Sequence, residues 1–183
     1  LSLGVDTSVE LWSVVITNIG TNKINRNISF YPYFTIGYMS WLNQSATYNA
    51  ELNAIVAKAI TPYQKVDDYY KNQHFKDHTF LVSDCVPSAW SANQTTFEGI
   101  GGLQSPDEVH QDVMNCQSSC YEVPVAVLQY KIKLTSNSVK HINLCFGAAK
   151  DEHEILDIKQ KYLDHEIGLS SETQKYKHYL SQA

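Results

Sequence analysis

In the stretch Val127-Leu-Gln-Tyr-Lys-Ile-Lys-Leu134, apolar and polar side chains alternate from Leu128 to Leu134. Because successive side chains of a β-strand point to opposite faces, this period of two predicts a strand with one buried and one solvated face. The buried face takes Leu128, Tyr130, Ile132 and Leu134, and the solvated face takes Gln129, Lys131 and Lys133. Such a division is typical of antiparallel sheets, which cover a core with one side.

Other strand-like segments lie before and after this stretch. Residues 10–17 and 27–38 are rich in β-branched and aromatic residues, and the turn-forming Asn18-Ile-Gly-Thr-Asn22 separates them, so we expect a long antiparallel hairpin. Pro32 lacks an amide hydrogen, which indicates an edge or a bulge at that point. Further strands are expected at residues 53–61, 79–83 and 141–146. The predicted fold class is therefore mainly β, an antiparallel β-sandwich.

The last part of the chain changes to a helical period. Asp151 and Glu154 have the spacing of a capping box, and the apolar residues that follow share one helical face: Ile155, Ile158, Tyr162 and Leu163. A second apolar stripe, Tyr176, Tyr179 and Leu180, is still running where the sequence stops. We expect a sandwich domain at residues 1–149, incomplete at its N-terminus, and short linker helices at 150–183.

Composition excludes several classes of protein. The 183 residues contain 14 Lys and Arg against 19 Asp and Glu, and the net charge of -5 is opposite to that of a general nucleic-acid binder. No apolar run approaches the roughly 20 residues of a membrane helix. The four cysteines are too few for a disulfide scaffold, which favours a cytoplasmic protein. Because the sequence starts at Leu1 rather than Met, we expect a fragment of a longer polypeptide.

The region from Asp84 to Val123 is rich in turn-forming and polar residues, and we expect a long loop there. Within it, Phe97-Glu-Gly-Ile-Gly-Gly-Leu103 is more consistent with a tight turn than with a phosphate-binding loop, because no helix pattern follows. Glu98 lies beside these glycines and is the best single carboxylate for contacting a substrate hydroxyl. His74 and His78 have metal-ligand spacing on a helix, but their charged neighbours favour a solvated segment, and no metal site or cofactor is predicted.

The stretch Tyr38-Met-Ser-Trp-Leu-Asn-Gln-Ser45 combines an indole ring with amide and hydroxyl groups. Proteins bind sugars in this way, with a sugar ring packed on an aromatic face and polar groups holding the hydroxyls. The candidate carbohydrate-binding residues are Trp41, Asn43, Gln44, Trp90 and Glu98. The alternative is that the aromatic residues of this stretch belong to an ordinary sandwich core.

These segments, together with Ile60-Thr-Pro-Tyr-Gln-Lys65 and Phe146-Gly-Ala-Ala-Lys-Asp-Glu-His-Glu154, resemble the amino-terminal sandwich of glycoside hydrolase family 94. This family contains the cellobiose, cellodextrin and chitobiose phosphorylases. The resemblance runs from about Leu3 to about Tyr162, and the runs Tyr38-Met-Ser-Trp and Thr61-Pro-Tyr-Gln-Lys are most similar to the branch acting on cellobionic acid.

The resemblance implies a galactose-mutarotase-like super-sandwich, followed by linker helices and an (α/α)6 barrel that carries the catalytic acid and the phosphate site. Phosphate would be the co-substrate, and a β-glucoside such as a disaccharide would yield α-glucose 1-phosphate with inversion. The barrel lies outside this sequence, so no catalytic residue is assigned to it. In the family, the sandwich supports homodimers, and one of its loops can line the neighbouring active site; residues 41–44 and 64–72 are the polar loops considered for that role.

Two other hypotheses remain open from the sequence. One is a stand-alone carbohydrate-binding module without catalysis, which the aromatic loops favour. The other is a mutarotase-like epimerase, which needs a histidine acid and a carboxylate base across a groove, and His74 or His78 with Glu98 is the only set available.

Overall fold

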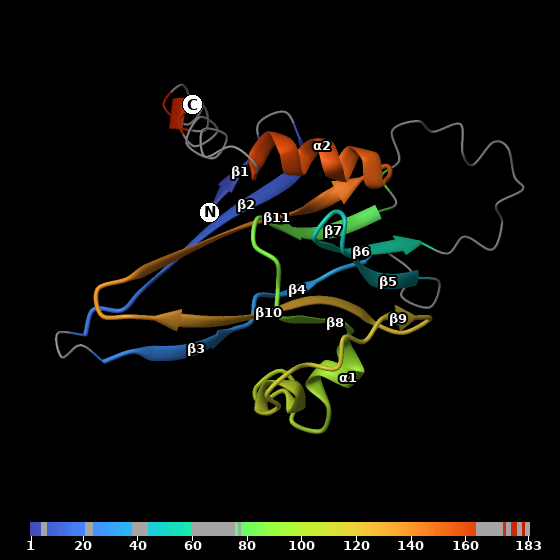
Figure 1. The fold of residues 1–183 in the computed structure, drawn as a ribbon. Coiled ribbons are helices and arrows are strands. Elements are labelled where there is room, and N and C mark those ends of the chain that lie inside the picture. Colours follow the sequence, from blue (N-terminus) through green and yellow to red (C-terminus); the bar gives the residue numbers. More distant parts are fainter. Residues whose placement is uncertain are drawn as a thin grey trace, which may run out of the picture.

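The computed structural model describes residues 1–4, 7–20, 24–37, 44–59, 76, 78–163, 174, 177–178 and 181. The strands are β1 (Ser2–Leu3), β2 (Val9–Thr17), β3 (Arg26–Phe30), β4 (Tyr33–Thr35), β5 (Gln44–Asn49), β6 (Ala54–Ala59), β7 (His78–Ser83), β8 (Ala89–Asn93), β9 (Ser119–Cys120), β10 (Pro124–Leu134) and β11 (Val139–Ala149). The helices are α1 (Gln94–Glu98), the 3-10 helix η2 (Asp107–His110) and α2 (Glu152–Tyr162) (Figure 1).

Within these residues the strands form two antiparallel sheets that pack face to face. Seven strands make the larger sheet, in the order β1-β2-β11-β7-β6-β5-β9, and β3, β4 and β8 pair with β10 in a four-stranded sheet. The two longest strands, β10 and β11, follow each other along the chain but belong to different sheets. The predicted antiparallel β-sandwich is confirmed, and α2 supplies a short helix after it.

The alternation of β10 is confirmed with one correction. Leu128, Tyr130, Ile132 and Leu134 face the larger sheet and are at most 7% exposed, whereas Lys131 and Lys133 are exposed. Gln129, predicted to be solvated, is fully buried. The reason is that α1, η2 and the chain after them cover this end of the outer face, where the Gln129 amide donates hydrogen bonds to the Tyr31 hydroxyl (2.9 Å) and the Asp112 carbonyl (3.1 Å).

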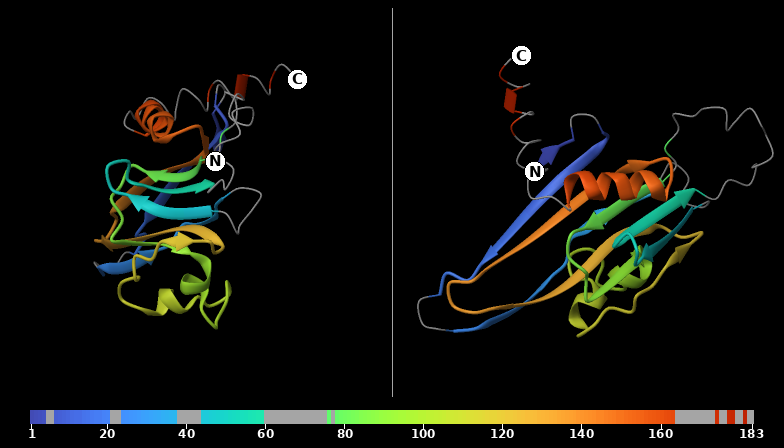
Figure 2. Two further views of the ribbon diagram at one scale, coloured as in Figure 1. Left: turned by 90° about the vertical axis from the view of Figure 1, so that its right-hand side faces the viewer. Right: turned by 45° about the horizontal axis from the view of Figure 1, so that its top comes forward.

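The structure therefore has four layers, which the left view of Figure 2 shows edge-on: α2, the larger sheet, the smaller sheet and the α1–η2 region. Three apolar clusters fill the spaces between them. Aromatic rings join the two sheets in the middle cluster: the Phe34 ring contacts that of Trp12 edge-on at 5.4 Å and stacks on that of Phe146 at 5.1 Å between centroids.

The helix predicted after Asp151 is confirmed, including its cap and its buried face. The Asp151 side chain accepts a hydrogen bond from the Glu154 amide at 2.8 Å, which satisfies one free N–H of the first turn. Ile155, Ile158 and Tyr162 pack on the outer face of the larger sheet. The Tyr162 ring is fully buried, and its hydroxyl lies 2.8 Å from that of Thr7. The second predicted stripe, Tyr176, Tyr179 and Leu180, lies outside the described residues.

Two sequence expectations about connections are wrong. β2 and the segment after it do not form a hairpin: β2 pairs with β1 and β11, whereas β3 pairs with β10 in the other sheet. Pro32 falls between β3 and β4 and ends the ladder there. The region 84–123 is also not a plain loop, because it contains β8, α1, η2 and β9. The side chain of Asn93 caps α1 by accepting from the Thr96 amide at 3.0 Å.

The turn between β5 and β6 depends on the side chain of Asn53, which is 6% exposed. Its amide nitrogen donates to the carbonyl oxygens of Ser83 and Cys85, each at 2.8 Å, and its oxygen accepts from the Tyr48 hydroxyl at 2.6 Å. The backbone of Asn53 has φ of 57°, a left-handed conformation that asparagine adopts more readily than other residues with a Cβ. One residue therefore fixes both a turn and the end of β7.

Replacing Asn53 should be costly for two separable reasons. Asn53→Ala removes one buried and two partly buried hydrogen bonds and places an alanine at positive φ, so we expect a loss of about 2–4 kcal/mol in the free energy of unfolding. Asn53→Gly removes the same hydrogen bonds without the backbone strain and should be less destabilised, by about 1 kcal/mol. Urea denaturation measures both. Equal losses for the two variants would contradict the strain, and losses under about 0.5 kcal/mol for both would contradict the network.

Ion pairs join the start of α2 to the sheet beneath it. The Lys58 ammonium of β6 contacts the Glu152 carboxylate, which also accepts from the Asn49 amide of β5 at 3.1 Å. Lys76 contacts Glu154 at 2.6 Å. The hydrogen bond from Lys58 is the main cause that lowers the pKa of Glu152. A carboxyl group with a lowered pKa in the folded state stabilises the fold above its unfolded pKa and loses that contribution as the pH falls.

We expect Glu152→Gln to destabilise the chain at pH 7 by about 0.2–1 kcal/mol, because both side chains of the pair with Lys58 are partly exposed to water. The difference from the unmodified chain should shrink as the pH falls below about 4, where the carboxylate becomes protonated. Urea denaturation at pH 7 and at pH 3 checks this, with Glu51→Gln, an exposed carboxylate in the β5–β6 turn, as the matched control. A difference that grows at low pH would contradict the assigned sign.

Candidate functional site

The five sequence-predicted carbohydrate-binding residues do not share one described site. Trp41 and Asn43 lie outside the described residues, as do His74 and the whole of 64–72. Gln44 begins β5, Trp90 lies in β8 and Glu98 ends α1. These three positions belong to the larger sheet, the smaller sheet and the layer beneath it, respectively.

Glu98 contributes to the packing of α1 on the smaller sheet. One oxygen of its carboxylate accepts from the Tyr33 hydroxyl and from the Gln94 amide, both at 2.8 Å. Burial of Tyr33 and its hydrogen bond to Glu98 raise the pKa of that phenol. The arrangement fixes the helix against β4. His78 begins β7 in the larger sheet, so the two sheets separate it from Glu98, and this pair of the epimerase hypothesis does not face across a groove.

The glycine-rich segment after Glu98 forms a tight turn, as predicted. The Asp107 carboxylate accepts from the backbone amides of Ile100 at 3.0 Å and Gly101 at 3.3 Å. Gly99 has φ of 56°, and a Cβ at this position would lie 2.0 Å from the Asp107 carboxylate. The Asp107 carboxylate thus already accepts hydrogen bonds from the two backbone amides that a phosphate would need.

Trp90 stacks on Tyr48 of β5, with ring centroids 5.6 Å apart and planes inclined by 21°. The two rings come from different sheets, and they join the sandwich near its edge. Tyr48 is in turn held by Asn53, and burial raises the pKa of its phenol. Trp90 is therefore partly buried by a neighbouring aromatic residue.

Gln44 contacts Gly37, and these two are the described residues on either side of 38–43. Gln44 is 3% exposed and fills the space over Gly37, where an added Cβ would lie 2.2 Å from the Gln44 amide oxygen. Gly37 has φ of 109°, which only glycine adopts without strain.

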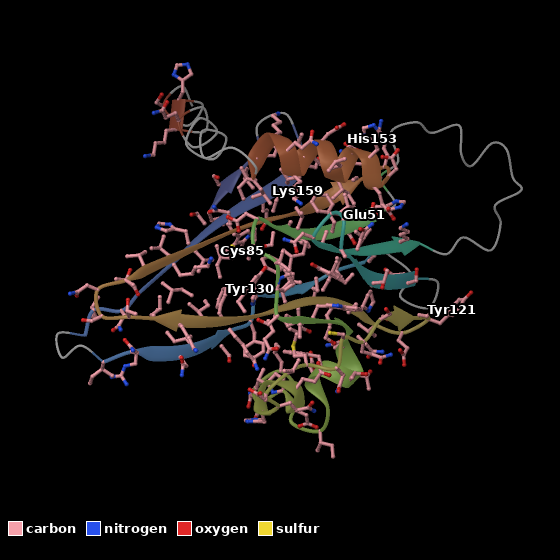
Figure 3. The ribbon with its side chains drawn as sticks, viewed as in Figure 1. Glu51, Cys85, Tyr121, Tyr130, His153 and Lys159 are labelled. Carbon is pink, nitrogen blue, oxygen red and sulfur yellow. The ribbon has the colours of Figure 1, made fainter. Side chains whose placement is uncertain are left out.

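The backbone carbonyl of Gln44 also accepts from the Tyr121 amide at 2.9 Å. Tyr121 belongs to the segment Gln117–Glu122, which runs along the edge of the sandwich: β9 pairs with β5, and the Gln117 carbonyl accepts from the Ala92 amide of β8. We call Gln117–Glu122 together with Thr47 the edge strip. Its exposed groups include the hydroxyls of Thr47 and Ser118, 2.8 Å apart, and the Tyr121 ring, which points away from the strands (Figure 3).

The edge strip was missed in the sequence. It carries hydroxyl, amide, carboxylate and aromatic groups on one exposed segment, beside the attachment of the predicted sugar-contacting stretch. This is the chemistry that sugar binding requires. A single tyrosine in a polar segment of the sequence does not reveal such a surface, because the position of Tyr121 depends on the pairing of β9 with β5.

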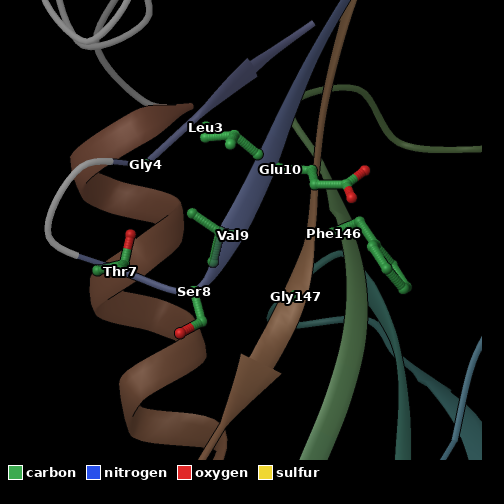
Figure 4. A pocket seen from close by; sticks show the side chains of 8 residues that line it. All are labelled: Leu3, Gly4, Thr7, Ser8, Val9, Glu10, Phe146 and Gly147. Atoms are coloured by element: carbon green, nitrogen blue, oxygen red, sulfur yellow. The ribbon is translucent and has the colours of Figure 1, made fainter. Parts of the chain in front are cut away.

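A pocket of about 310 Å³ lies elsewhere, beside β1, β2 and β11 (Figure 4). It is lined by Leu3, Gly4, Thr7, Ser8, Val9, Glu10, Phe146 and Gly147. Its walls are mainly apolar, and its one carboxylate, that of Glu10, accepts from the Trp12 indole at 3.1 Å. None of the sequence-predicted residues lines it.

The described part of the chain contains no group of three or more His, Cys, Asp or Glu side chains placed to hold a metal ion. None of its helices is long and apolar enough to cross a membrane. The cysteines are free thiols, with Cys116 and Cys120 exposed and Cys145 buried.

Comparison with known proteins agrees with the fold. The chain is 40% identical to the cellobionic acid phosphorylase of Neurospora crassa over 99% of its own length, and it spans 23% of the length of that relative. The sequence model of the glycosyl hydrolase 94 supersandwich domain matches residues 4–165, from just after β1 to just beyond the end of α2. The chain therefore belongs to the glycosyl hydrolase 94 family and corresponds to its supersandwich domain.

Proposed function

We propose that this chain is the sandwich segment of a disaccharide phosphorylase whose substrate is cellobionic acid. The observation that carries the proposal is the 40% identity to the Neurospora cellobionic acid phosphorylase along almost the whole chain. The family model supports it, because it matches this segment as one domain. The substrate assignment extends what is known of that relative to this protein.

The proposed reaction is phosphorolysis with inversion. Phosphate attacks the anomeric carbon of the β-linked glucosyl unit while a carboxylic acid protonates the leaving oxygen, and α-glucose 1-phosphate forms. Phosphate takes the place of the water used by an inverting hydrolase, so the protein supplies one acid rather than an acid and a base. We place that acid and the phosphate site in a catalytic domain outside this sequence. The role of this segment is to contact carbohydrate and to support assembly.

The geometry of the described carboxylates favours this division. Glu98 is held by Tyr33 and Gln94, Asp107 closes the glycine turn, and the largely buried Glu108 accepts from the Asn115 amide at 2.8 Å. Each of these groups serves a local structural contact. The cytoplasmic location stays a prediction, and the free thiols of the chain are compatible with a reducing compartment.

An activity assay tests the proposal. A full-length polypeptide containing this sequence should release α-glucose 1-phosphate from cellobionic acid, strictly dependent on inorganic phosphate, whereas the 183-residue chain alone should give only background. Loss of a general acid alone typically costs about 10²–10⁴ in rate, and loss of the phosphate site adds to it.

Cellobiose serves as the comparison substrate in this assay, and reactions without phosphate are the control. Turnover by the 183-residue chain would place the catalytic acid inside this sequence and contradict the proposal. Release of free sugar without phosphate would identify a hydrolase instead. Sugar binding without turnover by the full-length protein would favour the carbohydrate-binding module.

We also propose that the phosphorylase is a homodimer. The glycine turn offers a contact for it, because Ile100 is fully exposed and Leu103 is 63% exposed on a turn that Asp107 holds rigid. Exposed apolar side chains that lie together mark sites of protein–protein contact.

Ile100→Asp should weaken this self-association by placing a charge in the apolar contact. Light scattering after size-exclusion chromatography of the full-length protein measures the oligomeric state over a range of concentrations. Val86→Asp, which changes an exposed valine between β7 and β8, is the matched control. A dimer that Ile100→Asp leaves unchanged would exclude this turn from the interface.

A further inference from the structure

The outer edge of β2 is mostly unpaired among the residues that the structure describes. On one side, β2 pairs with β11 over its whole length. On the other side, β1 pairs only with Glu10 and Leu11. Every second residue of an antiparallel strand directs its N–H and C=O groups away from a given neighbour. Residues 12–17 therefore present backbone groups along the margin of the larger sheet, where β2 lies in the right view of Figure 2.

The sequence of this edge lacks the features that keep strand edges from pairing. The run Trp12-Ser-Val-Val-Ile-Thr17 contains no charge, proline or glycine, and all of its residues except the serine favour β-strands. Other described edges are protected: β1 and β9 have two residues each, and β3 carries Arg26 and is followed by Pro32. An unprotected edge of this kind is a template for a further strand.

The pairing of β1 with β2 defines the direction and register in which such a strand fits. The two strands are antiparallel, so the row that β1 occupies runs backward along the chain toward Thr17 of β2. Extended one residue at a time, the register places Leu1 opposite Trp12, the third residue before Leu1 opposite Val15, and the fifth opposite Thr17. A strand in this row continues β1 directly, so it needs no turn and no loop has to be closed.

Two occupants can be compared for this edge. In the Neurospora relative, of which this chain spans 23%, most of the polypeptide lies outside the matching segment. A second copy of this chain is the alternative. Because β1 already occupies the row beside Glu10 and Leu11, a second copy could pair only with residues 12–17. Such a short pairing buries much less than the roughly 1,200–2,000 Å² of a stable interface, which favours a strand of the same polypeptide.

We propose that in the full-length polypeptide β1 continues into a longer strand, formed by the five residues directly before Leu1, that pairs with residues 12–17 of β2. Its side chains alternate between two faces. The third residue before Leu1 lies beside Val15, which is 54% exposed. The fourth lies beside Ile16, which packs on the cluster between the sheets, so we expect an apolar residue there. This pairing does not depend on the substrate, which the phosphate-dependent assay decides separately.

Hydrogen exchange of the full-length polypeptide and of the 183-residue chain tests the pairing. The outward amides of residues 12–17 should exchange about 100-fold more slowly in the full-length protein, because they gain hydrogen bonds there. The interior strand β7 serves as the reference, so that a general gain in stability cancels. Equal relative exchange in the two proteins would overturn the inference. Slow exchange at these amides in the monomeric 183-residue chain would also overturn it, because another segment of this chain would then cover the edge.

A disulfide in the full-length protein tests the register. Val15→Cys is combined with a cysteine at the third residue before Leu1, and we expect an intramolecular disulfide after oxidation, because directly opposed Cβ atoms lie about 4.5–5.5 Å apart. The matched control combines Val15→Cys with a cysteine at the fourth residue, whose side chain points to the other face and should not link. Mass spectrometry of the digested protein identifies the linked peptides. No link, a link in the control alone, or a link between two chains would each overturn the inference.

Discussion

The whole arrangement depends on the burial of both faces of β10 over its first half. Residues 124–130 are all buried: Ala126, Leu128 and Tyr130 belong to the apolar cluster between the sheets, and Val125 and Val127 to the cluster beneath. A strand buried on both sides needs a cover for each face. The larger sheet supplies one cover, and α1, η2 and the chain around Met114 supply the other. Beyond Tyr130 the second cover ends, and the lysines begin.

This constraint also determines how the chain reaches the edge of the sandwich. The chain that covers the outer face of β10 must return to it, and the return passes along the edge of the sandwich as Gln117–Glu122. There it pairs with β5 on one side and contacts β8 on the other. The interior clusters are apolar and closed, whereas this crossing is exposed and polar. The geometry of the crossing, rather than any conserved-looking motif, brings Tyr121 to Gln44.

Local sequence patterns predicted the strands and helices themselves better than they predicted which strands pair with each other. The period of two in β10 and the apolar face of α2 could be recognised in the sequence. Each pattern reflects the burial of one face of a single element, so it appears in that element's own residues. The pairing of β2 was not visible. Strands that follow each other in sequence pair or lie side by side in about two-thirds of cases. Here β2 instead pairs with β11 in the larger sheet, and β3 pairs with β10 in the smaller sheet. Gln129 was predicted to be exposed for a similar reason. The segment that covers it, α1, η2 and the chain after them, shows no periodicity in its sequence. The same limit applies to the edge strip, where the positive φ of Tyr121 is imposed by contacts distant in sequence.

The distribution of polar groups also bears on how such a domain takes part in catalysis. Its described carboxylates are mostly committed: Glu152 to Lys58, Glu154 to Lys76 and Asp107 to backbone amides. Inverting phosphorolysis needs one carboxylic acid, because phosphate itself is the nucleophile. A supporting domain in such an enzyme therefore has no need to provide a second titrating group. The described carboxylates of this chain accordingly stabilise the fold, as that of Asp107 does by holding the glycine turn through the amides of Ile100 and Gly101.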